Sequence, residues 1–235
     1  MAVDHSSHST VPAAFVESIN VGTPRTVEWQ GHEFMTSIWK APTLERVAVR
    51  GVNIAGDEQA DRRVHGGEYK AIYAYGRDDL DWWSRELGKK LGAGAFGENL
   101  TVGGMQVSSA LVGERWKIGS VLLEVTQPRF PCYKLATKME DSHFVQRFAA
   151  AERPGAYLRI VEEGEMGAGD TVDVVHRPDH EMTMRGMSHI YLKDRDSAFR
   201  LLGLPGLPPE WHEWIERYAA GPTGDDDSSV AGEEG

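Results

Sequence analysis

The sequence predicts a mainly β fold, built as a closed barrel or a sandwich and followed by appended helices. From about residue 15 to 175 the chain is a series of short apolar runs, rich in Val, Ile and aromatic residues, which Gly, Pro, Asn and Asp interrupt. After residue 175 the apolar residues take up helical spacing instead. Many short strands punctuated by glycine favour a barrel or sandwich over a doubly wound parallel sheet.

Nine segments have the composition of strands, and several of them alternate with period two. They are residues 13–22, 26–30, 32–39, 45–56, 70–76, 98–104, 114–127, 156–164 and 170–175. Residues 18–29 look like a hairpin, with Gly22, Thr23 and Pro24 near its turn. Two helices are expected to interrupt the strands. One covers 78–87, where acidic residues suit a helix N-terminus, and the other covers 142–151.

Changes in composition along the chain predict four regions. Residues 1–14 form a Ser-rich flexible leader, 15–178 the strand-rich domain, 179–220 a region of three short helices, and 221–235 a disordered acidic tail. Helix starts are predicted at Asp194 and at Pro208–Pro209. The tail carries five acidic residues and no basic one, so it cannot bury enough apolar surface to order itself.

Overall composition is that of a folded domain and excludes collagen-like, fully disordered and disulfide-stapled proteins. The chain has 235 residues, of which 40% are hydrophobic, and a single cysteine, which cannot form an internal disulfide. No apolar run approaches the ~18 residues of a membrane span, and no signal peptide is evident, so we expect a cytoplasmic protein without a membrane partner. The net charge of −11 argues against binding a nucleic acid polymer, but it is compatible with a local basic pocket for a small anion.

Cys132 lies in the segment QPRFPCYKL, residues 127–135, at the end of an apolar strand and just before a helix. Pro128 and Pro131 restrict the backbone there, so the strand ladder cannot continue normally. Arg129 and Lys134 flank the cysteine, and nearby positive charge favours the thiolate, which binds metals and attacks electrophiles. From the residues alone, this functional reading and a buried apolar cysteine stay open alternatives.

Charged residues also cluster around the pair Gly66–Gly67, within residues 56–76. Arg62, His65 and Lys70 stand on either side of the glycines, whose backbone can approach a ligand closely. Their N–H groups, together with Arg and Lys side chains, could hold a phosphate, and His65 could act as an acid, a hydrogen-bond donor or a metal ligand. The alternative is a solvated charged turn. No second His or Cys stands at a spacing that would complete a structural zinc site.

Two further polar residues are candidates only if the fold brings them close to these two clusters. Asn99 follows Gly97 and Glu98 at the start of an expected strand, and its amide could hydrogen-bond a heterocycle edge or simply close a turn. Lys40 lies near the end of the segment TSIWKAP and is a surface lysine unless it contacts a phosphate. The chain has no Walker A, dinucleotide-binding, G-x-S-x-G or H-E-x-x-H motif.

Taken together and in this order, these segments resemble the MOSC family, named after the C-terminal domain of molybdenum-cofactor sulfurase, and within it the YiiM-like branch. The matching blocks are GDEQADRRVHGGEYKAIYAYG, GAFGENLTV, LVGERWKIGSVLLEVTQPRFPCYKL and HEMTMRGMSHIYLKDRD, and the likeness extends from about residue 15 to 218. The resemblance implies a MOSC-type β-barrel followed by a small three-helix C-terminal region.

The resemblance also implies a molybdenum cofactor (Mo-molybdopterin) with Cys132 as the protein ligand of the metal, which suits a soft thiolate. His65 is the expected proton donor and forms, with Cys132, the expected catalytic pair. The positions that match the family's charged and polar blocks, and are therefore the expected cofactor contacts, are Lys40, Arg62, His65, Lys70, Asn99 and Arg129.

The activity implied is the reduction of small N-hydroxylated compounds, from N–OH to N–H with loss of water. The chain has no flavin or nicotinamide fingerprint and too few cysteines for an iron–sulfur cluster, so we expect electrons from a separate flavoprotein or ferredoxin-type reductase. Two alternatives remain: a carrier of the cofactor or of sulfur without turnover, and a metal-free thiol enzyme with His65 as base. The helical region could serve homodimerisation or reductase docking.

Overall fold

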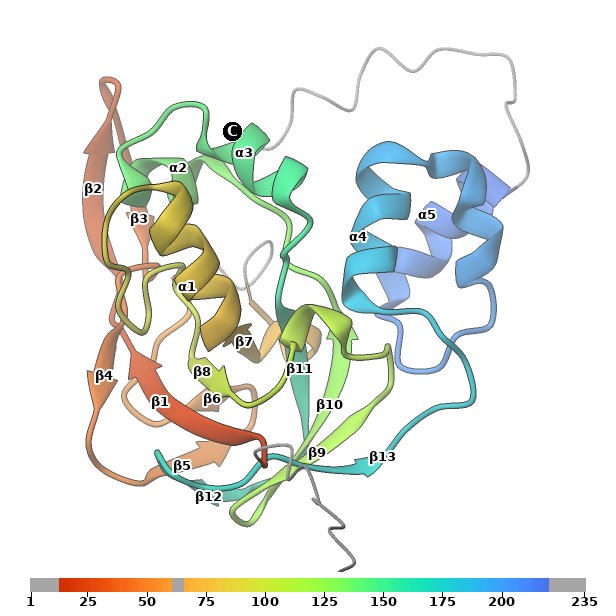
Figure 1. Ribbon diagram of the computed structural model, residues 1–235, viewed down its shortest axis with the longest axis horizontal. Coiled ribbons are helices and arrows are strands. Elements are labelled where there is room, and N and C mark those ends of the chain that lie inside the picture. The colour runs from red at the N-terminus through yellow and green to blue at the C-terminus, as the bar shows by residue number, and fades with distance from the viewer. Residues whose placement is uncertain (1–12, 61–65, 220–235) are drawn as a thin grey trace, which may run out of the picture.

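The computed structural model describes residues 13–60 and 66–219, and its main feature is one eight-stranded sheet (Figure 1). Neighbouring strands are antiparallel except β7 and β8, which are parallel. In spatial order the strands are β13 (Asp173–His176), β9 (Arg115–Ile118), β10 (Val121–Gln127), β11 (Ala156–Glu162), β7 (Ile72–Gly76), β8 (Leu100–Gly103), β1 (Phe15–Val21) and β4 (Ala41–Thr43).

Two smaller sheets complete the β structure. One has the order β12 (Gly164–Met166), β5 (Val47–Arg50) and β6 (Asn53–Ile54), and the other is a hairpin of β2 (Arg25–Trp29) and β3 (His32–Thr36). The hairpin turns at Gln30 and Gly31, both with positive φ, which matches the twist of two antiparallel strands. The predicted hairpin over residues 18–29 is therefore wrong, because β1 pairs with β4 and β8 and leaves β2 to β3.

The ladders within the described residues do not close into the predicted barrel. The sheet ends at β13 on one side and at β4 on the other, and these two strands do not pair. Pro42 lies inside the three-residue β4 and has no N–H to donate, as is typical of an edge strand. The chain just before β13 nevertheless returns to β1, where Phe15 forms an isolated bridge with Thr171 and Val16 donates to Asp170. The mainly β class is confirmed, whereas the closed barrel is not.

Three helices cover the sheet on the side of β7. The helices are α1 (Arg77–Glu86), α2 (Tyr133–Met139) and α3 (Phe144–Ala151), and short 3-10 helices, η1 (Glu68–Lys70) and η2 (Val107–Ser109), lie in the connections. Their apolar side chains form a separate buried cluster with Tyr73 and Tyr75 of β7. The predicted helices over 78–87 and 142–151 are confirmed as α1 and α3. The sequence places Cys132 before a helix but predicts that helix only over 142–151, so the separate short helix α2, which begins directly after Cys132, was not predicted.

The C-terminal stretch contains α4 (Met184–Lys193), the 3-10 helix η3 (Arg195–Leu201) and α5 (Pro209–Ala219). Thr183 caps α4 by accepting a hydrogen bond from Gly186, Asp194 precedes η3, and α5 begins at Pro209 as predicted. Apolar side chains of α4 and α5 belong to the same buried cluster as the strands, so these helices share the core of the sheet. Among the described residues, each helix is too short or too polar to cross a membrane. The division at residues 178 and 179 stays a prediction.

Candidate functional site

A cavity lies beside β3, β7 and β11 (Tyr157) and the connections that lead into β7, β8 and α2. Its walls come from the connection after β3, the chain that follows β6, the residues just before β7 and β8, and the segment between β10 and α2. The polar and charged lining residues are Thr36, Ser37, Lys40, Asp57, Glu58, Gln59, Lys70, Tyr73, Asn99, Arg129, Cys132, Lys134 and Tyr157. Four of these side chains are cationic and two acidic, so the cavity is locally basic although the chain carries a net charge of −11.

Cys132 is the residue directly before helix α2, and it lines this cavity. Its extended backbone (φ −135°, ψ 168°) makes it the residue before the first helical turn, and its carbonyl accepts from the backbone of Leu135. The side chain is partly exposed, so the thiol is not sealed in the core. This placement matches what a reactive or metal-binding cysteine needs: access, nearby positive charge and a helix N-terminus.

Arg129 is buried beside Cys132 and its side chain is only partly satisfied. It is 6% exposed, and its guanidinium lies over the rings of Tyr73 (5.2 Å) and Phe148 (5.7 Å). Burial disfavours its charge, but the neighbouring Tyr73, Cys132 and Tyr157 groups outweigh that cost and raise the pKa of Arg129. Among residues 13–60 and 66–219, one guanidinium nitrogen, Nη1, is buried without a hydrogen-bond partner, and so is the hydroxyl oxygen of Ser37 on the same cavity. Such orphaned groups mark the place where an anionic or polar ligand would complete the site.

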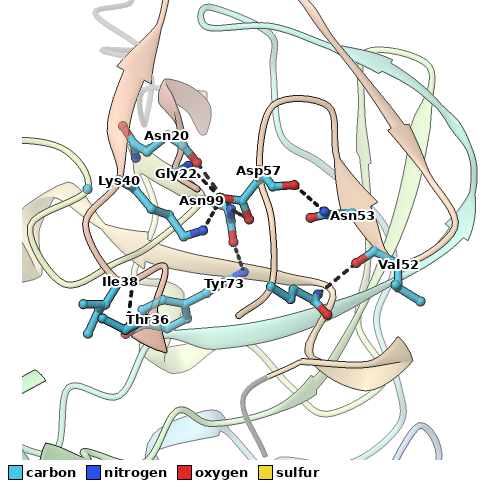
Figure 2. A network of polar contacts seen from close by, with 12 residues as sticks. Asn20, Gly22, Thr36, Ile38, Lys40, Val52, Asn53, Asp57, Tyr73 and Asn99 are labelled. Carbon is cyan, nitrogen blue, oxygen red and sulfur yellow. Dashed lines mark hydrogen bonds and ion pairs between the residues drawn. The ribbon is translucent and has the colours of Figure 1, made fainter. Parts of the chain in front are cut away.

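One wall of the cavity is a hydrogen-bonded network centred on Asp57 (Figure 2). One carboxylate oxygen of Asp57 pairs with the ammonium of Lys40 and accepts from the backbone of Gly22, and the other accepts from the amide of Asn99 at 2.9 Å. The amide of Asn99 also donates to the carbonyl of Asn20 at 3.3 Å and accepts from the backbone N–H of Tyr73 at 3.1 Å. Burial lowers the pKa of Lys40, although Asp57 opposes the shift.

Two charged side chains behind this network, the buried Glu98 and the partly exposed Lys138, hold the loops that form the wall. Lys138 of α2 donates to the carbonyls of Ile38 and Gly94, so it ties the connection after β3 to the loop before β8. Burial lowers the pKa of Lys138 to about 8, with Glu98 opposing. Glu98 accepts from the backbone of Gly94 and Phe96, and burial raises its pKa. Gly97 can only be glycine here, since its φ is +78° and a Cβ would stand 2.6 Å from Ile38.

The predicted residues are brought together to a large extent. Five of them line the one cavity: Lys40, Lys70, Asn99, Arg129 and Cys132. Arg62 and His65 lie outside the described residues. Of the glycine pair, Gly67 has the expected positive φ of 89°, but its N–H donates to the side chain of Gln59 at 3.0 Å.

Sequence reasoning missed several residues of the cavity. Ser37, Asp57, Tyr73 and Tyr157 were not among the candidates. Only Asp57 carried a signal, because it opens the same charged segment, residues 56–76, that contains Arg62 and His65. The other three are a hydroxyl in a connection and two aromatic side chains within strands, which look like ordinary structural residues.

Comparison with known proteins decides the family. A MOSC domain model matches residues 61–173, which include Lys70, Asn99, Arg129 and Cys132. The protein YflK of Bacillus subtilis is 32% identical over 199 residues, a match that covers 83% of this chain and 90% of YflK. The chain belongs to the MOSC domain family. The protein YiiM of Escherichia coli is 31% identical over 172 residues, 71% of this chain and 76% of that protein.

Solved structures place the fold close to YiiM within the MOSC family. The crystal structure of YiiM from Geobacillus stearothermophilus has 30% identity and a TM-score of 0.73, covering 87% of this chain and 98% of its own. YiiM from Escherichia coli, at 23% identity and a TM-score of 0.71, shows the same fold. A protein of Gibberella moniliformis named "Reductase" is 29% identical over 73% of this chain, which matches only 31% of that longer protein.

Proposed function

We propose that this MOSC protein binds the molybdenum cofactor in the cavity beside Cys132 and reduces N-hydroxylated compounds. The observation that carries the proposal is the pairing of a partly exposed thiol with a buried, partly unsatisfied guanidinium on one basic cavity. The family match and the relative named as a reductase favour an oxidoreductase over other uses of such a cavity.

The donor set of the cavity fits such a cofactor. Among residues 13–60 and 66–219 there is no group of three or more His, Cys, Asp or Glu side chains that could hold a bare metal ion. Cys132 would therefore supply one soft ligand, and the remaining ligands would have to come from an organic cofactor. The cationic side chains of Lys70, Arg129 and Lys134 suit an anionic group such as its phosphate.

The volume of the cavity determines how much of such a ligand the protein could enclose. The enclosed part of the cavity has a volume of about 100 Å³, below the ~300–1,000 Å³ of typical ligand pockets. The described residues would thus enclose only part of a pterin-sized ligand, and the rest would lie at the mouth. Ala60 and Lys70, which flank the charged glycine segment in the sequence, both line the cavity.

The overall reaction breaks an N–O bond and forms an N–H bond, and it consumes two electrons and two protons to release one water. When bound, the molybdenum cofactor supplies the two-electron reduction. The chain's own side chains would do the remaining work: Cys132 would hold the metal, Arg129 would compensate negative charge, and His65 is the proposed proton donor. Burial raises the pKa of Tyr157, so its hydroxyl stays protonated and can donate a hydrogen bond into the cavity.

Electrons would come from an external reductase of the flavoprotein or ferredoxin type, because the chain carries one cysteine and no flavin or nicotinamide motif. The substrate would be a small N-hydroxylated molecule that reaches the mouth of the cavity.

The test is to purify the chain from a molybdenum-replete host and to measure bound metal by mass spectrometry. We expect about one molybdenum per chain in the unaltered protein and almost none in Cys132→Ser, which removes the soft ligand and little else. Ser109→Ala, an exposed change of the same size in η2, is the matched control and should load normally. Equal metal in Cys132→Ser and the control would overturn the proposed ligand.

Turnover is tested separately on the loaded protein. A hydroxylamine or amidoxime is supplied with an artificial electron donor, and amine or amidine is measured as product. Loaded protein that reduces none of a broad panel would favour the carrier function over the enzyme. Loss of rate with retained metal in His65→Ala is expected, while loss of metal would assign His65 to cofactor binding instead.

A further inference from the structure

The segment between β10 and α2, residues 128–132, carries both Arg129 and Cys132 but belongs to no regular element. Pro128 and Pro131 lack a backbone N–H, so this segment cannot be held by a strand ladder on both sides. Apart from the hydrogen bonds that the carbonyl of Cys132 accepts from the backbone of Leu135 and Ala136, side-chain contacts hold the segment in position. Arg129 points its charge toward the cavity, where it lies over Tyr73 and Phe148.

On its other side the segment is packed against the C-terminal helices. The ring of Phe130 lies 4.3 Å from that of Tyr191 in α4, at an interplanar angle of 31°, and 5.9 Å from that of Trp211 in α5. Phe130 also lines the cavity, so a single ring separates α4 and α5 from the site. Figure 1 shows both helices on the flank of the sheet beside β10.

A hydrogen bond from α5 holds the residue at which the segment begins. The indole N–H of Trp211 donates to the side-chain oxygen of Gln127, the last residue of β10, at 3.0 Å. Both side chains are buried, at 4% exposure for Trp211 and 3% for Gln127. The amide nitrogen of Gln127 has no partner among the described residues, so the bond from Trp211 accounts for the orientation of this side chain.

We propose that Trp211 and Tyr191 are positioning residues, through which the C-terminal helices hold the segment that carries Arg129 and Cys132 against the cavity. The consequence for a bound cofactor rests on the proposed function above, whereas the effect on the position of Cys132 does not. In this arrangement the helical region is part of the site's framework, although it lies outside the residues matched by the family model.

The single cysteine gives a direct readout, because any thiol-selective reagent reports on Cys132 alone. The full chain is produced in a host that makes no molybdenum cofactor, and the rate of alkylation by N-ethylmaleimide is measured at one fixed pH. Trp211→Phe keeps an aromatic ring, although a smaller one, and removes the hydrogen bond to Gln127. We expect it to raise the alkylation rate about threefold to tenfold, the range set by losing one hydrogen bond that restrains the segment.

Trp214→Phe is the matched control. Trp214 also lies on α5, and its ring contacts Tyr191, Trp211 and Tyr218 within the helical region. It should lower the thermal midpoint to a similar degree and change the alkylation rate by no more than about twofold, because it does not hold Gln127. An unchanged rate in Trp211→Phe, or an equal rise in Trp214→Phe, would overturn the positioning role.

If Trp211→Phe does not fold, Phe130→Leu provides a second test of the same role. It preserves an apolar side chain but removes stacking on Tyr191, and it should raise the rate as Trp211→Phe does. A wild-type rate in Phe130→Leu would overturn the proposal. None of these rates depends on molybdenum, so a failure of the cofactor proposal would leave the result intact.

Discussion

The two sides of the cavity differ in how completely their polar groups are satisfied. On the bonded wall, formed by Lys40, Asp57 and Asn99, each side chain has partners within the protein. On the open side, formed by Ser37, Arg129 and Cys132, a buried hydroxyl and a buried guanidinium nitrogen have none within the part of the chain that the structure describes. All six side chains line the same cavity, and Arg129 is as buried as Asp57 and Asn99, so burial alone does not explain the difference.

This contrast distinguishes residues that hold the site together from residues that could contact a ligand. In the sequence the two kinds looked equivalent. Both amide hydrogens of Asn99 are used by Asp57 and Asn20, so Asn99 is better suited to hold the strand entrance than to bind a ligand. Arg129 is buried despite its charge, and one of its donor nitrogens has no partner among the described residues. This is the state expected of a group that binds a ligand.

The largest effect on stability should follow from breaking the bonded wall with Asp57→Ala. The variant leaves the buried ammonium of Lys40 and the amide of Asn99 without their acceptor. Loss of one partner from a buried ion pair costs about 3–5 kcal/mol, to be measured as the free energy of unfolding in urea. The double variant Lys40→Met/Asp57→Leu removes both charges and should recover part of that loss. A loss below about 1 kcal/mol in the single variant would show that the wall is not a scaffold.

A second, pH-dependent effect should come from Lys138, which ties the loops of the bonded wall together. Its pKa is about 8 in the folded protein against 10.5 for an ordinary lysine, so the unfolded chain binds more protons between these two pH values. Stability must therefore rise with pH across that window, by at most about 1.4 kcal/mol per pH unit, and the cost of the buried charge is present in full below it.

The measurement compares the unaltered protein with Lys138→Met, in urea, at about pH 7 and about pH 9.5. Subtracting the variant removes the contributions of all other titrating groups. The difference should shift in favour of the unaltered protein at the higher pH. A difference that stays constant or shifts the other way would contradict the burial of this charge.

From the sequence, the residues of this site could be identified more readily than the contacts between them. Cys132, Arg129 and Asn99 could be selected because their residue types stand in distinctive segments. The partner of Lys40 could not, since Asp57 is one of 36 acidic residues and lies 17 positions away. The same holds for pairing: β1 lies next to β8, which follows it by some eighty residues, and a local pattern of strand and turn suggested a hairpin with β2 instead. The range of helix α2 was not predicted, because two prolines precede it and it spans only seven residues.

The smallest effect on stability, and the sharpest on ligand binding, is expected from Arg129→Met on the open side. Methionine keeps the apolar contacts with Tyr73 and Phe148 and removes both the cost of a buried charge and its unsatisfied nitrogen. The free energy of unfolding of the cofactor-free protein should change by no more than about 1 kcal/mol, since these contributions oppose each other. Molybdenum retained on purification should fall steeply, and Arg129→Lys, with its charge but no planar fork, should retain an intermediate amount. If Arg129→Met instead destabilised the chain as much as Asp57→Ala and still held molybdenum, both sides of the cavity would be scaffold, and the ligand would have to be bound elsewhere.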